Sequence, residues 1–106
     1  MDPIYHEAIE EARTLLAGAP GRLDRHTARV AQLAERVLAG TQAADAAVVR
    51  VAVAWHDIGR TQQADGHEKV SARMARRALA NAGASESVAR DVYHAILRHN
   101  WRMQPY

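Results

Sequence analysis

The sequence predicts an all-α protein, a compact bundle of about five helices formed by residues 1–106 as a single domain. The chain has 106 residues, and hydrophobic cores divide only in chains of roughly 250 residues or more. Hydrophobic residues make up 48% and charged residues 25% of the chain, which is typical of globular proteins. Alanine is abundant, phenylalanine is absent, and no stretch has the period-2 alternation of a strand.

The first two helices are expected to begin near an Asp and to end at a glycine. Asp2 is a candidate N-cap with Pro3 at the first helical position, and the Gly-Ala-Pro-Gly segment 18–21 ends that helix. Asp24 is the candidate cap of the second helix, which ends before Gly40. The apolar positions that follow the helical period are Ile4, Ala8, Ala12, Leu15 and Leu16 in the first helix, and Val30, Leu33, Ala34, Val37 and Leu38 in the second.

The third helix is expected over residues 43–57 and is apolar on nearly all sides, which is typical of a central, buried helix. Gly59 ends it, and a polar loop, residues 60–66, follows. The fourth helix starts near His67 and stops at the Asn-Ala-Gly segment 81–83. Ser85 caps the fifth helix, whose inner side is expected to carry Val88, Val92, Ala95, Ile96 and His99.

Composition restricts the function classes. The chain has no cysteine, so any metal must be held by histidines and carboxylates. No signal-peptide pattern occurs at the N-terminus, and the longest apolar stretch is too short and too charged for a membrane span, because Asp45 and Arg50 interrupt it. The net charge is only +2, and acidic residues are interspersed without a clear one-sided Arg stripe. We therefore expect a cytoplasmic protein that does not bind membranes. This pattern argues against nucleic-acid binding, and an Arg-rich nucleic-acid binder stays a third hypothesis.

The pair His56-Asp57 stands at the end of the most apolar helix. A carboxylate there is costly unless it is compensated, because it lies near the negative end of the helix dipole and away from bulk water. A divalent ion such as Zn, Mn, Fe or Mg would compensate it and suits a His–carboxylate pair. The spacing alone equally allows a structural pair, in which Asp57 binds His56 or Arg60.

Four motifs occur in order along the chain: HTARV at residues 26–30, WHDIGR at 55–60, GHEKVSA at 66–72 and AILRH at 95–99. Together they resemble the ordered motif set of the HD superfamily of all-helical, metal-dependent phosphohydrolases, over about residues 22–101. The resemblance implies an HD-domain-like bundle. It also implies an enzyme that hydrolyses a nucleotide or other small phosphate ester through a metal-activated water.

By this resemblance His26, His56 and Asp57 are expected to bind a divalent ion (Mn, Zn, Mg, Fe, Ni or Co). His67, His99 and Arg60 are expected to be catalytic, acting on the phosphate or on protons. For His67 the alternative is a solvent-facing residue of a first helical turn, and for His99 a cation at a helix end. The other two histidines, His6 and His94, fall outside the motifs and are expected at the surface or in ordinary packing contacts.

The chain departs from the family's pattern at its C-terminal end. That pattern continues to a further Asp on a later helix, and no Asp follows Asp91 here. The fourth protein ligand and the C-terminal helices are therefore expected to be missing, although three ligands and water still suit zinc. The alternative function is a non-catalytic HD-like module that binds a nucleotide or a protein partner. An exposed C-terminal face would favour a homo-oligomer.

Overall fold

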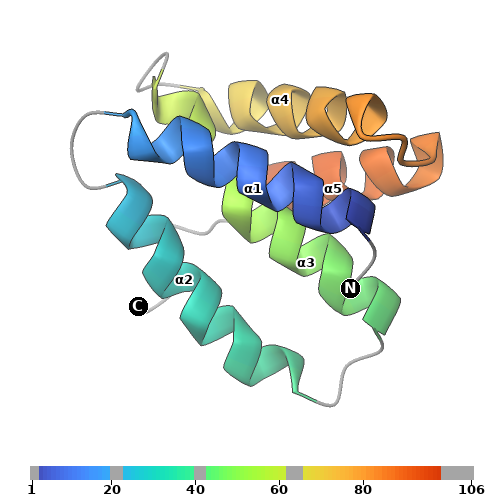
Figure 1. Cartoon of the computed structure of the whole chain (residues 1–106), viewed down its shortest axis with the longest axis horizontal. Helices are drawn as coiled ribbons and strands as arrows, with labels where there is room; N and C mark the ends of the chain where they lie inside the picture. The colour runs from blue at the N-terminus through green and yellow to red at the C-terminus, as the bar shows by residue number, and fades with distance from the viewer. Residues whose placement is uncertain (1–2, 20–22, 40–42, 62–65, 99–106) are drawn as a thin grey trace.

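The computed structural model describes residues 3–19, 23–39, 43–61 and 66–98, with the side chains of residues 37 and 43–45 excepted (Figure 1). Five α-helices follow one another as α1 (Pro3–Ala17), α2 (Leu23–Leu38), α3 (Ala43–Trp55), α4 (His67–Asn81) and α5 (Glu86–Arg98). A short 3₁₀ helix, η1 (Ile58–Thr61), follows α3. The described residues contain no strand, so the chain has the all-α architecture that its sequence predicts.

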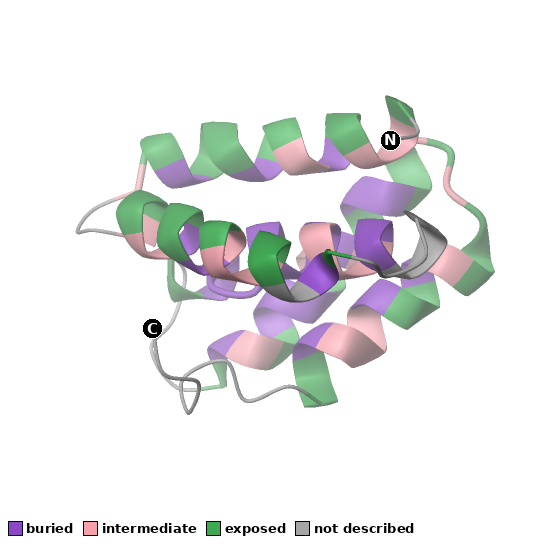
Figure 2. Ribbon diagram, turned by 90° about the horizontal axis from the view of Figure 1, so that it is seen from below, coloured by how far each residue is buried: buried purple, intermediate pink, exposed green. Residues whose placement is uncertain are grey.

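Helix α3 is the centre of the bundle. It contacts α1, α2, α4 and α5, and four of its last five residues, Val51, Ala52, Val53 and Trp55, are at most 1% exposed. Buried residues in the other helices lie on the sides that face α3 or one another, and the outer sides are exposed (Figure 2). The expectation of a central third helix is therefore confirmed.

The remaining helices surround α3 in two groups. Helices α1 and α4 lie side by side, and α5 packs against α4 and α3 (Figure 1). Helix α2 packs mainly against α3 and less closely against α1. The beginning of α2 and the residues that follow α3 can therefore meet on one flank of the central helix.

The predicted ends of α4 and the start of α5 are confirmed. The backbone N–H of Ala82 donates to the carbonyl of Ala78 at 3.0 Å, and Gly83 has a φ of 95°, which favours glycine. Ser85 Oγ accepts from the backbone N–H of Val88 at 3.2 Å, as an N-cap should.

Three details of the sequence prediction are wrong. Leu15 is 41% exposed, because the buried residues of α1 repeat every fourth position, at Ala8, Ala12 and Leu16, and Leu15 falls beside that narrow stripe. Helix α2 already begins at Leu23, so Asp24 lies inside its first turn. Helix α3 ends at Trp55, two residues earlier than expected, so the following His-Asp pair lies in a turn.

Several sequence predictions concern residues outside the described part of the chain. These are Asp2, Gly40, His99, the side chain of Val37 and the expected C-terminal face. Within the described residues, none of the helices is both long enough and apolar enough to cross a membrane.

One buried hydrogen bond joins α1 to α3, and its removal should destabilise the bundle. Trp55 Nε1 donates to the backbone carbonyl of Ala8 at 3.0 Å. We expect Trp55→Phe to lower the free energy of unfolding by about 1–3 kcal/mol, because it removes a buried donor and leaves unfilled volume. Denaturant-induced unfolding measures this difference. Tyr93→Phe is the control, since no hydrogen bond of its hydroxyl is found among the described residues; equal losses in both variants would contradict a specific role for this bond.

Candidate metal centre

His56 and Asp57 lie in the turn between α3 and η1, and each is 3% exposed. The backbone N–H of Arg60 donates to the carbonyl of Asp57 at 3.0 Å, which closes this turn. Because the chain leaves the helical path after Trp55, the two adjacent side chains no longer have to point about 100° apart. Both reach the same position on the flank of α3.

The structure brings together the three residues that the sequence predicts as metal ligands. One ligand atom each of His26, His56 and Asp57 lies within 4.8 Å of the other two. His26 Nε2 is 3.0 Å and His56 Nε2 is 3.3 Å from Asp57 Oδ2. Two imidazole nitrogens and one carboxylate oxygen at these distances are a suitable donor set for a divalent transition-metal ion.

The orientation of the His56 ring supports this interpretation. Its Nδ1 lies 2.6 Å from the carbonyl oxygen of Val53, and a carbonyl can only accept, so Nδ1 carries the hydrogen. Neutral His56 therefore presents the lone pair of Nε2 to Asp57 Oδ2. Metal-binding histidines commonly have this second hydrogen bond, which holds the ring and fixes its tautomer.

The protonation of the cluster also suits a metal. Burial opposes ionisation of Asp57, but the positive charge of Arg60, together with the hydrogen bond from His56 and the charges of His56 and His26 when these imidazoles are protonated, lowers its pKa to about 2. Burial lowers the pKa of His26, and His56 and Arg60 add to this effect, while Asp57 opposes it. Near neutral pH an ionised carboxylate and an accessible imidazole lone pair are therefore available at the same point.

The other carboxylate oxygen faces two of the predicted catalytic residues. Asp57 Oδ1 lies 3.2 Å from Arg60 Nε and 3.3 Å from His67 Nε2. Arg60 Nε also donates to His67 Nε2 at 3.4 Å. The side chain of His67 is only 2% exposed, so the alternative of a solvent-facing His67 is wrong. The side chain of Arg60 is 39% exposed, so it borders both the cluster and the solvent.

A contact between η1 and the first turns of α4 holds these residues together. The backbone N–H of Gly59 donates to Ser71 Oγ at 2.7 Å, and Ser71 is fully buried. A Cβ atom at Gly59 would collide with the backbone carbonyl oxygen of His67 and would lie 2.8 Å from Ser71 Oγ. Only glycine allows η1 to approach α4 this closely, and that approach places His67 beside Asp57.

Sequence reasoning did not assign a function to two residues near the site. Ser71 is the partner of Gly59, and its position four residues after His67 puts it on the same side of α4. Glu68 Oε1 lies 3.7 Å from His67 Nε2. Both residues belong to the GHEKVSA motif, so the motif could have indicated that they lie near the site. It could not have predicted the atoms that they contact.

The remaining histidines divide as follows. His99 lies outside the described residues. His6 is exposed on α1, and His94 is half-buried on α5, where its ring meets that of Tyr93 edge-on at 5.5 Å. Among the described residues neither belongs to the group that could hold a metal ion, as the sequence predicts.

Comparison with known proteins identifies one family. A family model described as HD domain matches residues 23–106, which is more than half of the chain and contains every residue of the cluster. Neither the curated proteins nor the solved structures include a match to this sequence.

The close approach at Gly59 makes a direct prediction. Gly59→Ala should force η1 and α4 apart, because its Cβ would meet backbone that cannot move as a side chain can. We expect it to lower the free energy of unfolding by roughly 1–3 kcal/mol and to weaken metal binding. Gly18→Ala is the matched control, since the nearest atom to its Cβ would be the Leu15 carbonyl oxygen at 3.9 Å. Thermal unfolding with and without metal compares the two variants, and a Gly59→Ala protein as stable as Gly18→Ala would contradict the prediction.

Proposed function

The chain belongs to the HD-domain family, and on that premise we propose that it is a metal-dependent phosphohydrolase acting on a nucleotide or another small phosphate ester. The observation that carries this proposal is the cluster of His26, His56 and Asp57, whose ligand atoms lie within 4.8 Å of one another. Three protein ligands leave further coordination positions for water and substrate.

His26, His56 and Asp57 would hold the ion. When bound, a divalent metal acts as a Lewis acid on a phosphate oxygen and lowers the pKa of a coordinated water towards about 7. Mg²⁺ fits this set less well than the other ions, because it prefers oxygen ligands and the set is two-thirds imidazole. We therefore propose Zn, Mn, Fe, Co or Ni as the ion.

Arg60 is the proposed phosphate-binding residue. Its Nε contacts Asp57 and His67, while the two terminal amino groups are not part of these contacts and can pair with phosphate oxygens. The planar guanidinium matches two oxygens at once, which an ammonium group cannot do. A partly exposed position beside the ligands suits a group that must meet an incoming substrate.

His67 is the proposed proton-transfer residue. Its Nε2 lies 3.3 Å from Asp57 Oδ1, on the side of the carboxylate away from His26 and His56. A histidine can exchange protons near neutral pH. In a two-metal form of the site, His67 Nε2 would hold a second divalent ion, as the family resemblance implies for this position.

Metal content is the first test. We expect the purified protein to contain near-stoichiometric metal by elemental analysis, and Asp57→Asn and His56→Ala to bind metal at least about 100-fold more weakly, because each loses a ligand. His94→Ala is the control, since it removes a histidine from the same fold outside the cluster. Equal metal in all four proteins would refute the site.

Activity tests the roles of the other residues. We expect Arg60→Ala to keep its metal and to lower kcat/KM for phosphate monoesters by about 10–100-fold, because it loses charge stabilisation of the transferring phosphoryl group. Arg73→Ala, on the exposed side of α4, should leave both the metal content and kcat/KM unchanged. A metal-loaded wild-type protein that binds nucleotides but hydrolyses none of a broad panel would instead support the non-catalytic module.

A further inference from the structure

The outer side of α2 carries a basic stripe that we call the α2 track, formed by Arg25, Arg29, Gln32 and Arg36. All four residues are exposed. Their spacing of four, three and four residues places them on one side of the helix. At 1.5 Å per residue, the track extends roughly 16 Å along the helix axis.

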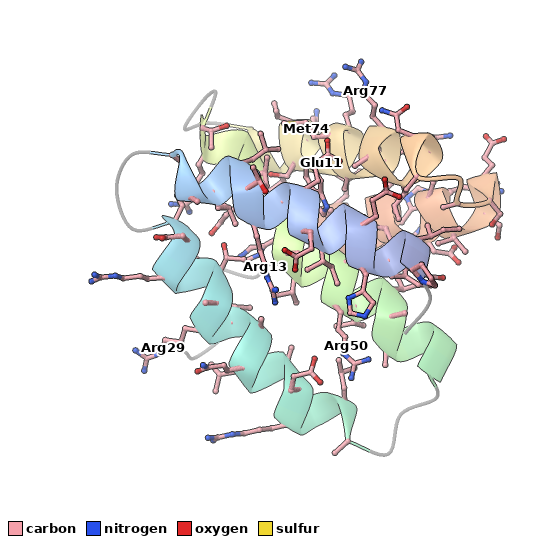
Figure 3. All side chains as sticks on the ribbon, in the orientation of Figure 1. Glu11, Arg13, Arg29, Arg50, Met74 and Arg77 are labelled. Atoms are coloured by element: carbon pink, nitrogen blue, oxygen red, sulfur yellow. The ribbon has the colours of Figure 1, made fainter. Side chains whose placement is uncertain are left out.

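The positive charge of the track is not neutralised by ion pairs within the described part of the chain. Two acidic residues of α2, Asp24 and Glu35, lie next to the ends of the track. The Glu35 carboxylate accepts two hydrogen bonds, of 2.6 and 2.8 Å, from Arg50 of α3. Asp24 accepts from the backbone N–H of Arg25 at 2.8 Å. Figure 3 shows Arg29 pointing away from the bundle, whereas Arg50 lies in the space between α2 and α3.

A surface hollow coincides with the track. It has a volume of about 570 Å³, and among the described residues it is lined by the four track residues together with Ala28 and Leu33. The apolar side chains of Ala28 and Leu33 give the hollow a hydrocarbon floor between the guanidinium groups. A ligand bound along the track would therefore contact both guanidinium groups and apolar side chains.

The N-terminal part of the track lies next to His26, one of the three candidate metal ligands. His26 follows Arg25 directly, and Arg29 lies one turn further along, only about 60° around the helix from His26. The wide cleft between α1, α2 and α3 adjoins the track, since Ala28 and Gln32 line both the hollow and the cleft. A chain of phosphates bound along the track would pass beside the candidate metal ligand His26.

We propose that the α2 track binds single-stranded nucleic acid. The three arginines are distributed over roughly 16 Å of the helix axis. A nucleoside triphosphate has its negative charges at one end, whereas an oligonucleotide presents phosphates at repeated intervals along such a length. Arginine planes stack on unpaired bases, and Gln32 can hydrogen-bond to bases or phosphates. The three arginines are not consecutive in the sequence. The helical period of α2 places their side chains on one face.

The test is fluorescence anisotropy of a labelled oligothymidylate about 12 nucleotides long, titrated with protein in EDTA over a range of salt concentrations. We expect binding at low salt that weakens as salt rises, with a slope of about −2 in a double-logarithmic plot for three phosphate contacts. The triple variant Arg25→Gln, Arg29→Gln, Arg36→Gln should lose at least about tenfold in affinity and most of this slope.

The matched control is Lys69→Gln, Arg73→Gln, Arg77→Gln, which makes the same change in net charge on the exposed side of α4. Figure 3 shows Arg77 on the far side of the bundle from Arg29. This control should lose less than about threefold in affinity, and circular dichroism should show both variants folded.

Four results would overturn the proposal. The first three are an absence of binding at low salt, equal losses in the two triple variants, and binding to phosphatidylserine vesicles without binding to the oligonucleotide. The fourth is complete displacement of the oligonucleotide by an equal concentration of ATP, because it would indicate a short phosphate site. Since EDTA removes metal from the assay, a failed hydrolase hypothesis would leave this measurement unaffected.

Discussion

The buried carboxylate of Asp57 is the constraint on which the rest of the site depends. Taking an ionised carboxylate out of water costs several kcal/mol unless partners compensate it. Here four side chains converge on it: His56 from the same turn, and His26 of α2, Arg60 of η1 and His67 of α4 from three other parts of the fold. The two carboxylate oxygens have different surroundings, two imidazoles at Oδ2 and a guanidinium with an imidazole at Oδ1. This asymmetry separates the side that could hold a metal ion from the side that faces Arg60 and His67.

The scaffold creates this convergence through α3 and two close contacts. Trp55 ties the end of α3 to α1 through the Ala8 carbonyl, and Gly59 ties η1 to α4 through Ser71. Between these two points the chain turns, and His56 and Asp57 occupy the turn. A rigid position on each side explains how a turn can hold ligands, since loose loops position functional groups less precisely than packed elements do. The α2 track and the cleft facing α1 adjoin along α2, where Ala28 and Gln32 line both.

Much of the fold was predictable because local signals and packing agree. The apolar character of α3 on nearly all sides predicted its burial, and the Ser85 cap and the glycine at position 83 predicted the boundaries of α4 and α5 correctly. The exposure of Leu15 and the early end of α3 were not predictable in this way. Both depend on neighbours that are distant in sequence, because apolar character along one helix does not specify how wide a face its neighbours cover.

For the site, the sequence by itself determined the residue types and, through the motif order, the identity of the three ligand candidates. Histidine and carboxylate were the only available ligands in a chain without cysteine, and the motifs assigned them to His26, His56 and Asp57. Only the tertiary structure decided that His67 is buried against Asp57, that Ser71 holds the turn through Gly59, and that the side of α2 with the three arginines is exposed. The physical reason is that each of these features depends on the distance and the relative orientation of two helices. They follow from how helices rotate and pack, which the order of residues along the chain does not contain explicitly.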